Sequence, residues 1–273
     1  MQDRKALQAG TSHFLGQNFA KAQEIKFQSE AGQLEYAWTT SWGVSTRLIG
    51  GLIMTHSDDD GLVLPPKLAP AHVIILPIYK TPEERAKVVP FCEGLKKDLA
   101  AQQYAGEAVR VRIDDRDIRG GDKKWQWVKR GVPIRLEIGL RDIDNGTLFP
   151  ARRDGVKSEK VAPAEFVATL AATLAEMQQG LLDRAAKLRD DATVKIDSLA
   201  EFEKFFTPKN ADEPEIHGGL AYCHFVDSPE IEEKLKELKV TVRCVPLDGE
   251  AEPGTCIFTG KPSAKRGVFA KSY

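Results

Sequence analysis

The sequence predicts an α/β protein with a mostly parallel sheet in its middle and a small α+β unit after it. Two observations carry this prediction: strand-like and helix-like segments alternate from residue 72 onward, and the segments become shorter from about residue 195. The 273 residues are 42% hydrophobic and 29% charged, a composition typical of a globular chain of two or three domains. Disorder is thereby excluded as the overall state.

The first seventy residues predict two strands and a helix. Residues 25–28 and 33–42 are rich in the aromatic and β-branched side chains of strands. Residues 45–56 space their apolar side chains as one buried helical face does, at Leu48, Ile49, Leu52 and Ile53. A hairpin and one helix cannot close a core, so we expect this segment to need the rest of the chain or a further N-terminal part to cover it.

Three prolines, Pro65, Pro66 and Pro70, predict a stiff extended linker, and we place a domain boundary there. A helix should begin after Thr81, because a capping side chain is followed by a proline at the first helical position. The middle of the chain then predicts strands at 72–79, 108–113, 132–138 and 148–152, and helices after Thr81, at 123–130 and at 163–189. This order favours a mostly parallel sheet covered by helices.

The last part predicts a helix at 199–206, a strand at 219–225, a helix at 228–238 and further short strands. We therefore expect domains at 1–70, 71–180 and 181–273.

Charge and hydropathy narrow the function classes. Lys and Arg number 39 against 40 Asp and Glu, so nucleic-acid affinity must come from a local patch. No apolar run approaches the ~20 residues that cross a bilayer, and residues 1–8 lack the apolar core of a signal peptide. We expect a cytoplasmic protein with no membrane partner. Four widely spaced cysteines (Cys92, Cys223, Cys244 and Cys256) favour free thiols, with metal ligation still to be tested.

Two short stretches, residues 6–19 and 39–50, stand out as candidate binding segments. The first surrounds His13 with small and polar residues, although a structural histidine is the alternative. Arg47 falls in the first turn of a predicted helix, where the helix dipole opposes a cation by about 0.3–1 kcal/mol. This placement suggests an anionic partner, and an exposed, salt-bridged arginine is the alternative.

A third stretch, residues 116–130, holds six basic residues against two acidic ones and interleaves them with Trp125 and Trp127. Unstacked bases need aromatic faces and the RNA backbone needs cations, so this stretch is a candidate for binding a single-stranded loop. The alternative is a solvated helix face with one tryptophan in the core. We expect the similarly basic Lys234, Lys236 and Lys239 to be ordinary solvated charges.

Three motifs give the chain a family resemblance: residues 11–19 (TSHFLGQNF), 41–47 (SWGVSTR) and 61–66 (GLVLPP). With its ending VFAKSY, the chain from Lys5 to Tyr273 resembles the C-terminal half of a prolyl-tRNA synthetase of the archaeal/eukaryotic-like type, a class II aminoacyl-tRNA synthetase. The resemblance implies the end of an antiparallel catalytic domain with its third signature motif at 1–70. It further implies an anticodon-binding α/β domain at 71–180 and the family's small α+β C-terminal domain at 181–273. The first two signature motifs would lie before Met1.

The resemblance also implies roles for particular residues. Activation joins the carboxylate of proline to the α-phosphate of ATP and expels pyrophosphate, so the site needs cations and Mg²⁺ against the phosphates. The implied contacts are Gln8, Thr11, Ser45 and Arg47 for ATP, with Arg47 as the catalytic residue, His13 and Trp42 for proline, and Arg116, Lys123, Lys124 and Trp125 for tRNA.

The implied activity is that of a proline–tRNA ligase acting on L-proline, ATP and tRNA(Pro) as a homodimer. The isolated chain is expected not to activate proline. The alternative is a non-catalytic tRNA-binding protein that retains the anticodon-binding domain. Looking for the second motif in frame before Met1 would separate these readings.

Two metal sites are not expected. Relatives with zinc carry four cysteines where this chain has Phe225, Ile231, Cys256 and Thr259, so a tetrahedral thiolate site cannot close. The acidic run at residues 58–60 is interpreted as a solvated loop and not a calcium site, because His56 and Lys67 stand where calcium ligands belong.

Overall fold

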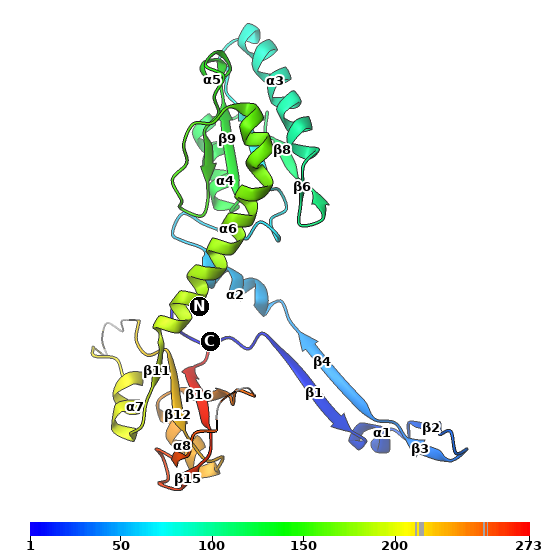
Figure 1. Cartoon of the computed structure of the whole chain (residues 1–273), viewed down its shortest axis with the longest axis vertical. Coiled ribbons are helices and arrows are strands. Elements are labelled where there is room, and N and C mark those ends of the chain that lie inside the picture. Colours follow the sequence, from blue (N-terminus) through cyan, green and yellow to red (C-terminus); the bar gives the residue numbers. More distant parts are fainter. Residues whose placement is uncertain (211, 213–215, 248, 250) are drawn as a thin grey trace. The chain divides into compact units, whose positions relative to one another are not determined.

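The structure is a computed structural model that describes residues 1–210, 212, 216–247, 249 and 251–273 (Figure 1). The chain divides into two compact units. The first combines Asp3–Leu52 with Ala192–Tyr273, and the second, the middle unit, runs from Ile53 to Asp191.

The middle unit is built on a four-stranded sheet. Its strand order is β10 (Pro150–Arg152), β9 (Ile134–Ile138), β5 (Val73–Pro77) and β8 (Val111–Ile113). β5 pairs in parallel with both β8 and β9, while β10 is antiparallel to β9. All five residues of β5 are buried, as a central strand covered on both faces requires. The predicted mostly parallel sheet is present.

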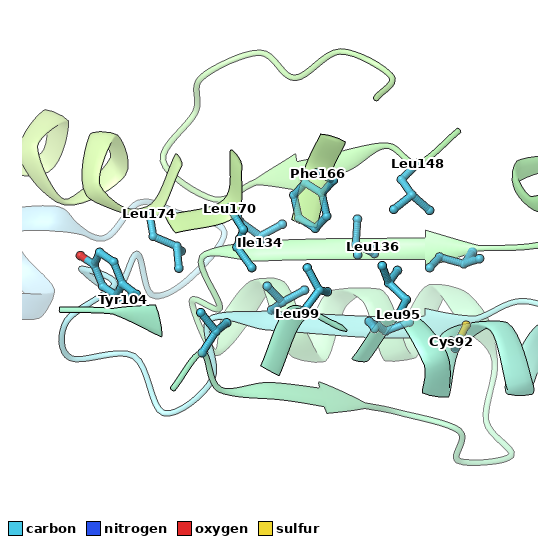
Figure 2. Close-up of a cluster of buried hydrophobic side chains, with 14 of the residues drawn as sticks. Cys92, Leu95, Leu99, Tyr104, Ile134, Leu136, Leu148, Phe166, Leu170 and Leu174 are labelled. Atoms are coloured by element: carbon cyan, nitrogen blue, oxygen red, sulfur yellow. The ribbon is translucent and has the colours of Figure 1, made fainter. Parts of the chain in front are cut away.

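Helices cover both faces of this sheet. Figure 2 shows α3 (Pro82–Ala100) and α6 (Pro163–Asp191) packing Leu99 and Phe166 around Ile134 and Leu136 on one face. On the other face, α4 (Gly120–Lys129) packs Trp127 against alternate residues of β5. The short elements β6 (Gln103–Tyr104), β7 (Glu107–Ala108) and α5 (Leu140–Asp144) complete the unit.

The helix α3 begins as the sequence predicts. Thr81 accepts a hydrogen bond from the backbone N–H of Glu84 at 3.2 Å, and Pro82 occupies the first helical position.

The proline-rich segment is not the extended linker that we expected. Pro65 and Pro66 are buried, and the Pro65 carbonyl accepts from the backbone N–H groups of Leu68 and Ala69 at 2.9 and 3.1 Å. The segment is a packed turn. The residues just before it are held by hydrogen bonds to the last residue of α4 and to Gly131 beyond it, from Leu62 N to Lys129 O and from Leu64 N to Gly131 O. It therefore belongs to the middle unit.

The far end of the middle unit is also continuous. The expected boundary between residues 180 and 181 falls inside α6, whose Leu181 is still buried. Arg184, one turn further on, donates to the backbone oxygen of Asp154 at 3.1 Å. These contacts extend the unit to the end of the helix.

The N-terminal part of the other unit consists of two hairpin-like pairs and a helix. β1 (Gly10–Gly16) pairs with β4 (Thr39–Val44), and β2 (Lys26–Gln28) pairs with β3 (Leu34–Tyr36), each antiparallel. The chain continues from α1 (Asn18–Ala22) to β2, and from β4 to α2 (Arg47–His56). The single strand predicted at 33–42 is thus two strands, and the break between them is where Trp38 stacks on Phe14, with ring centroids 5.6 Å apart.

Most of the predicted buried face of α2 is exposed, and its remaining member, Leu52, is half-buried. Leu48, Ile49 and Ile53 all face solvent, and Gly51 is the buried residue of this helix. The apolar spacing was correct, but among the described residues no element packs over these three side chains. We refer to residues 3–52 as the N-terminal arm.

The C-terminal part is a small α+β fold. Its sheet has the order β11 (Thr193–Lys195), β12 (Leu220–His224), β16 (Arg266–Lys271) and β13 (Val240–Cys244). The helices α7 (Leu199–Phe206) and α8 (Pro229–Glu237) lie where the sequence predicts them, and β14 (Gly254–Thr255) pairs with β15 (Pro262–Ser263). Phe202 packs edge-on against Phe269 at the centre of the core, with centroids 5.4 Å apart.

No helix in the described ranges is long and apolar enough to cross a membrane. The four cysteines are free thiols, and burial raises the pKa of Cys92 and of Cys223 to about 12.

Candidate functional site

Three of the residues expected to bind ATP come together at the start of α2. The Arg47 guanidinium donates from Nη1 to Oε1 of Gln8 at 3.3 Å, and the backbone N–H of Arg47 donates to Oγ of Ser45 at the same distance. Within the described part of the chain, no carboxylate lies within ion-pair distance of Arg47. A helix N-terminus with an unpaired guanidinium favours an anion, so this group suits a phosphate.

The same donor set does not suit a metal ion. Gln8, Ser45 and Arg47 offer no carboxylate, and the described residues contain no group of three or more His, Cys, Asp or Glu side chains that could hold a metal. The chemistry of these three side chains thus suits an anion better than Mg²⁺.

The strand register separates the two residues expected to bind proline. His13 lies opposite Ser41, whereas Trp42 lies opposite Ser12. Directly opposed residues share one face of an antiparallel pair, so His13 and Trp42 are on opposite faces of the ribbon. Thr11 is on the His13 face, opposite Gly43. Both expected proline contacts are exposed, Trp42 by 79%, so within the described chain they do not form one enclosed pocket.

The expected tRNA-binding segment packs around Asp114, which lies just before it and which we call the Asp114 hub. Arg116 donates to the Asp114 carboxylate from Nε and Nη2, both at 2.7 Å, and its Nη2 also donates to Gln126 at 2.9 Å. The indole N–H of Trp127 donates to the same carboxylate at 2.7 Å. The Arg116 guanidinium holds the pKa of the buried Asp114 carboxyl well below its usual range, and the Trp127 N–H adds to this effect against the opposing effect of burial.

This hub changes the interpretation of two candidates. Lys123 is buried, with its ammonium 3.5 Å from the backbone oxygen of Asp114, so it faces the hub and not solvent. Arg116 is partly exposed but bound in a two-pronged ion pair. Both residues organise the segment, and a sequence pattern counts them as free cations because it does not show the carboxylate between them.

Two of the candidates, Lys124 and Trp125, are exposed on α4. Trp125 is 48% exposed, while Trp127 is buried beneath the Arg130 guanidinium, 4.8 Å from its ring. One tryptophan is thus in the core and one faces solvent, as the sequence suggested. Lys124 is exposed and its ammonium lies 3.9 Å from Glu137. Trp125, Lys124 and the ion-paired Arg116 are thus the exposed candidates, while Lys123 is buried.

Sequence reasoning missed a second cluster at the same edge of the sheet. Asp115 accepts from the Tyr79 hydroxyl and from Arg85 Nη2, the latter at 2.6 Å. Asp115 follows β8 and Tyr79 follows β5, two parallel strands whose carboxyl ends meet at this edge. The adjacent acidic pair Asp114 and Asp115 directly after a predicted strand was the available signal.

Two of the four positions considered for zinc, Phe225 and Ile231, hold apolar side chains that pack in the C-terminal part. Ile231 is buried in the C-terminal core and Phe225 packs against that core. Asp58 of the acidic run is bound by Arg153 Nη1 at 2.6 Å, so it is pinned and not simply solvated.

Comparison with known proteins first defines the class. Residues 72–173 match the anticodon binding domain family, and residues 214–273 match the C-terminal domain of prolyl-tRNA synthetases. The first match contains the Asp114 hub and α4. The chain therefore contains an anticodon-binding domain and a prolyl-tRNA synthetase C-terminal domain.

The homologues along the whole chain are proline–tRNA ligases. The chain is 62% identical over 273 residues to the proline–tRNA ligase of Rhodopirellula baltica, and 56% identical over 275 residues to that of Bdellovibrio bacteriovorus. A third, from Flavobacterium johnsoniae, is 46% identical over 275 residues. Each match covers all of this chain but only 53%, 54% and 53% of these relatives, so the chain spans about half their length.

Proposed function

We propose that this chain is the C-terminal portion of a proline–tRNA ligase and that its middle unit recognises the anticodon of tRNA(Pro). The observation that carries the proposal is the exposed Trp125 on α4 of an anticodon-binding domain, held in place by the buried Trp127 and the Asp114 hub. We keep 1–70, 71–180 and 181–273 as the proposed division of the whole enzyme by family resemblance, whereas the compact units of this structure divide after Leu52 and after Asp191.

Anticodon recognition on this surface would use an aromatic face and nearby charge. Trp125 offers its ring to an unstacked base, a contact that contributes about 1–3 kcal/mol per base. Lys124 supplies a cation for the adjoining backbone. Arg116 and Lys123 stay proposals as tRNA contacts, and both also bind Asp114 just before α4.

The arm would contribute to activation of proline. When the carboxylate of proline attacks the α-phosphorus of ATP, negative charge increases on the phosphate oxygens and pyrophosphate leaves. The guanidinium of Arg47 is held by a hydrogen bond to the side-chain amide oxygen of Gln8, so it would stabilise that charge without having to reorient. Ser45 fixes the first turn of α2, and Thr11 lies on the neighbouring strand.

His13 and Trp42 stay proposals as proline contacts of the whole enzyme, each presented by its own face of the ribbon. Mg²⁺ would be held through the ATP phosphates. We also propose a cytoplasmic homodimer that belongs to the archaeal/eukaryotic-like type and carries no zinc in its C-terminal domain. Motifs 11–19 and 41–47 support the type, and the packing of Phe225 and Ile231 supports the absence of zinc.

Binding measurements on the 273-residue chain test the anticodon proposal. A tRNA(Pro) transcript and a transcript with a mutated anticodon are compared for wild type, Trp125→Ala and Phe149→Ala. Phe149 is a matched control, because it is an aromatic residue of the same unit with the same 48% exposure. Trp125→Ala should weaken the binding free energy for tRNA(Pro) by about 1–3 kcal/mol and reduce the difference in affinity between the two transcripts. Phe149→Ala should change neither quantity. Equal losses in both variants would contradict the proposal.

The alternative, a tRNA-binding protein without catalytic activity, is favoured by the opposite-face placement of His13 and Trp42. Recognition of tRNA is common to both proposals. They differ in whether a complete activation site exists, which aminoacylation by the full-length protein would decide.

A further inference from the structure

Three lysines meet where the N-terminal segment joins the C-terminal sheet. Ala6 donates its N–H to the backbone oxygen of Lys271 at 2.9 Å, and its carbonyl accepts from Tyr273 N at 3.1 Å. This pairing places Lys5 beside the end of β16. On the other side of β16, Val240 of β13 lies opposite Lys271, so Lys239 precedes the paired residue. We call Lys5, Lys239 and Lys271 the lysine cluster.

The acidic side chains next to the lysine cluster are too few to neutralise its three positive charges. Asp3 lies 3.7 Å from the Lys5 ammonium, and in the described ranges neither Lys239 nor Lys271 has a carboxylate within ion-pair distance. The Lys271 ammonium instead lies 2.6 Å from Nε2 of His217. Burial lowers the pKa of Lys271, and the charges of Lys239 and Lys5 lower it further. The three ammonium groups therefore repel one another. The carboxylate of Asp3 is the one acidic group of the described residues that lies within ion-pair distance of them.

The backbone at Lys239 supports a role for its side chain. The residue follows the C-cap of α8, Leu238, and has a φ of +56°, a left-handed conformation that usually selects glycine at this position. A lysine there strains the backbone, and strained non-glycine residues concentrate at functional positions. This backbone strain is an observation independent of the excess positive charge of the cluster. It also separates Lys239 from Lys234 and Lys236, which lie within α8 among the glutamates of that helix.

The surface next to the cluster is hollowed. A groove of about 870 Å³ begins at His217. Its charged lining consists of Arg4, Lys195, Lys204 and Lys209, with Glu201 and Glu203. The groove continues the positive charge of the cluster along α7, with four cations against two carboxylates. A chain of phosphates fits this arrangement better than a single small anion does.

We propose that the lysine cluster binds backbone phosphates of RNA, as a second contact for tRNA outside the anticodon-binding domain. The inference rests on the proposed function for the identity of the RNA. Such a contact is independent of sequence: it adds affinity and salt dependence but does not discriminate between anticodons. This replaces the sequence-based expectation that Lys239 is an ordinary solvated charge.

The test compares two double variants of the 273-residue chain. Lys239→Met with Lys271→Met removes two ammonium groups and keeps their apolar stems, and Lys234→Met with Lys236→Met is the matched control on α8. Dissociation constants for the tRNA(Pro) transcript and the anticodon-mutated transcript are measured by fluorescence anisotropy across a salt series. The cluster variant should bind both about tenfold more weakly at low salt. The slope of log affinity against log salt should flatten by about 1.5, since each neutralised phosphate contributes roughly 0.7–0.9.

A single variant guards against a folding artefact. Lys239→Gly removes one ammonium and relieves the left-handed backbone, so it should raise Tm while weakening RNA binding. A loss of binding caused by misfolding would lower Tm instead. A higher Tm with unchanged RNA binding would overturn the inference.

The outcomes separate this inference from the proposed function. If the cluster variant keeps the wild-type affinity and slope while wild type still discriminates between transcripts, the inference fails and the proposed function stands. If wild type binds without discrimination but the cluster variant flattens the slope, the proposed function fails and the phosphate contact stands. Stabilisation of wild type by inorganic pyrophosphate, lost in the cluster variant with RNA binding unchanged, would assign the cluster to a free phosphate compound and overturn the RNA contact.

Discussion

The N-terminal arm and the middle unit use the same kinds of residue in opposite ways. Phe14 and Trp42 of the arm are 73% and 79% exposed, whereas Phe166 and Trp127 of the middle unit are buried. Both regions carry the apolar spacing of ordinary strands and helices. The difference shows that such a pattern predicts which element forms and which face is apolar, but not what covers that face. The middle unit closes its own core, while the arm leaves its large aromatic side chains exposed.

The largest expected effect is in the core of the middle unit. Phe166→Ala should lower the free energy of unfolding by about 3–5 kcal/mol, because it removes a buried ring between α6 and the sheet. Phe14→Ala should change it by no more than about 0.5 kcal/mol. Denaturant unfolding of both variants checks the comparison, which would fail if Phe14→Ala were as costly as Phe166→Ala.

Acid should weaken the middle unit through His72. Burial, and then the charge of Arg110, lower the pKa of His72 from 6.5 to about 4. The unfolded chain then binds a proton that the folded chain does not, so stability falls as pH drops from about 6.5 to 4, by about 2–3 kcal/mol. Urea unfolding across this pH range measures the slope. His72→Gln should flatten it and His13→Gln, an exposed control in the arm, should not; identical slopes in both variants would contradict this account.

Asp114→Asn should cost about 1.5–3 kcal/mol at neutral pH, because the amide replaces a carboxylate that accepts charge-assisted hydrogen bonds from Arg116. In the wild type this contribution is lost as pH falls below the unfolded pKa of about 4, since the folded pKa is lower. Denaturant unfolding at pH 7 tests the cost. Asp117→Asn, an exposed neighbour, serves as the control and should be neutral.

The smallest expected effect has the opposite sign. Lys239→Gly should stabilise the C-terminal part by about 0.5–1 kcal/mol, because glycine adopts the left-handed conformation without strain. Lys236→Gly, inside α8, should instead destabilise it by about as much. Thermal unfolding distinguishes the two, and a loss of stability in both variants would contradict the claim of strain at Lys239.

Much of the fold was predictable because local signals agreed with the final packing. The capping threonine Thr81 with Pro82, and the apolar spacing of residues 199–206, gave helices in the right places. The packed turn at Pro65 and Pro66 was not predictable, since the residues before it form hydrogen bonds to Lys129 and Gly131, far along the chain.

The candidate site, like the fold, was predictable in part. Gln8, Ser45 and Arg47 were expected through the family resemblance, and the structure brings them together. The burial of Lys123 and the pairing of Arg116 could not be read from charge counts, because a sequence does not show which carboxylate folds back between two cations. The opposite faces of His13 and Trp42 required the strand register.

The most direct test is proline-dependent exchange of pyrophosphate into ATP by the 273-residue chain, with tRNA binding by the same preparation as proof of folding. The account predicts anticodon-dependent tRNA binding but no proline-dependent exchange of pyrophosphate. Arg47 is exposed, and His13 and Trp42, on opposite faces of the ribbon, do not enclose a pocket for proline. Exchange that depends on proline and disappears in Arg47→Ala would contradict it, since it would show that this chain forms a complete activation site.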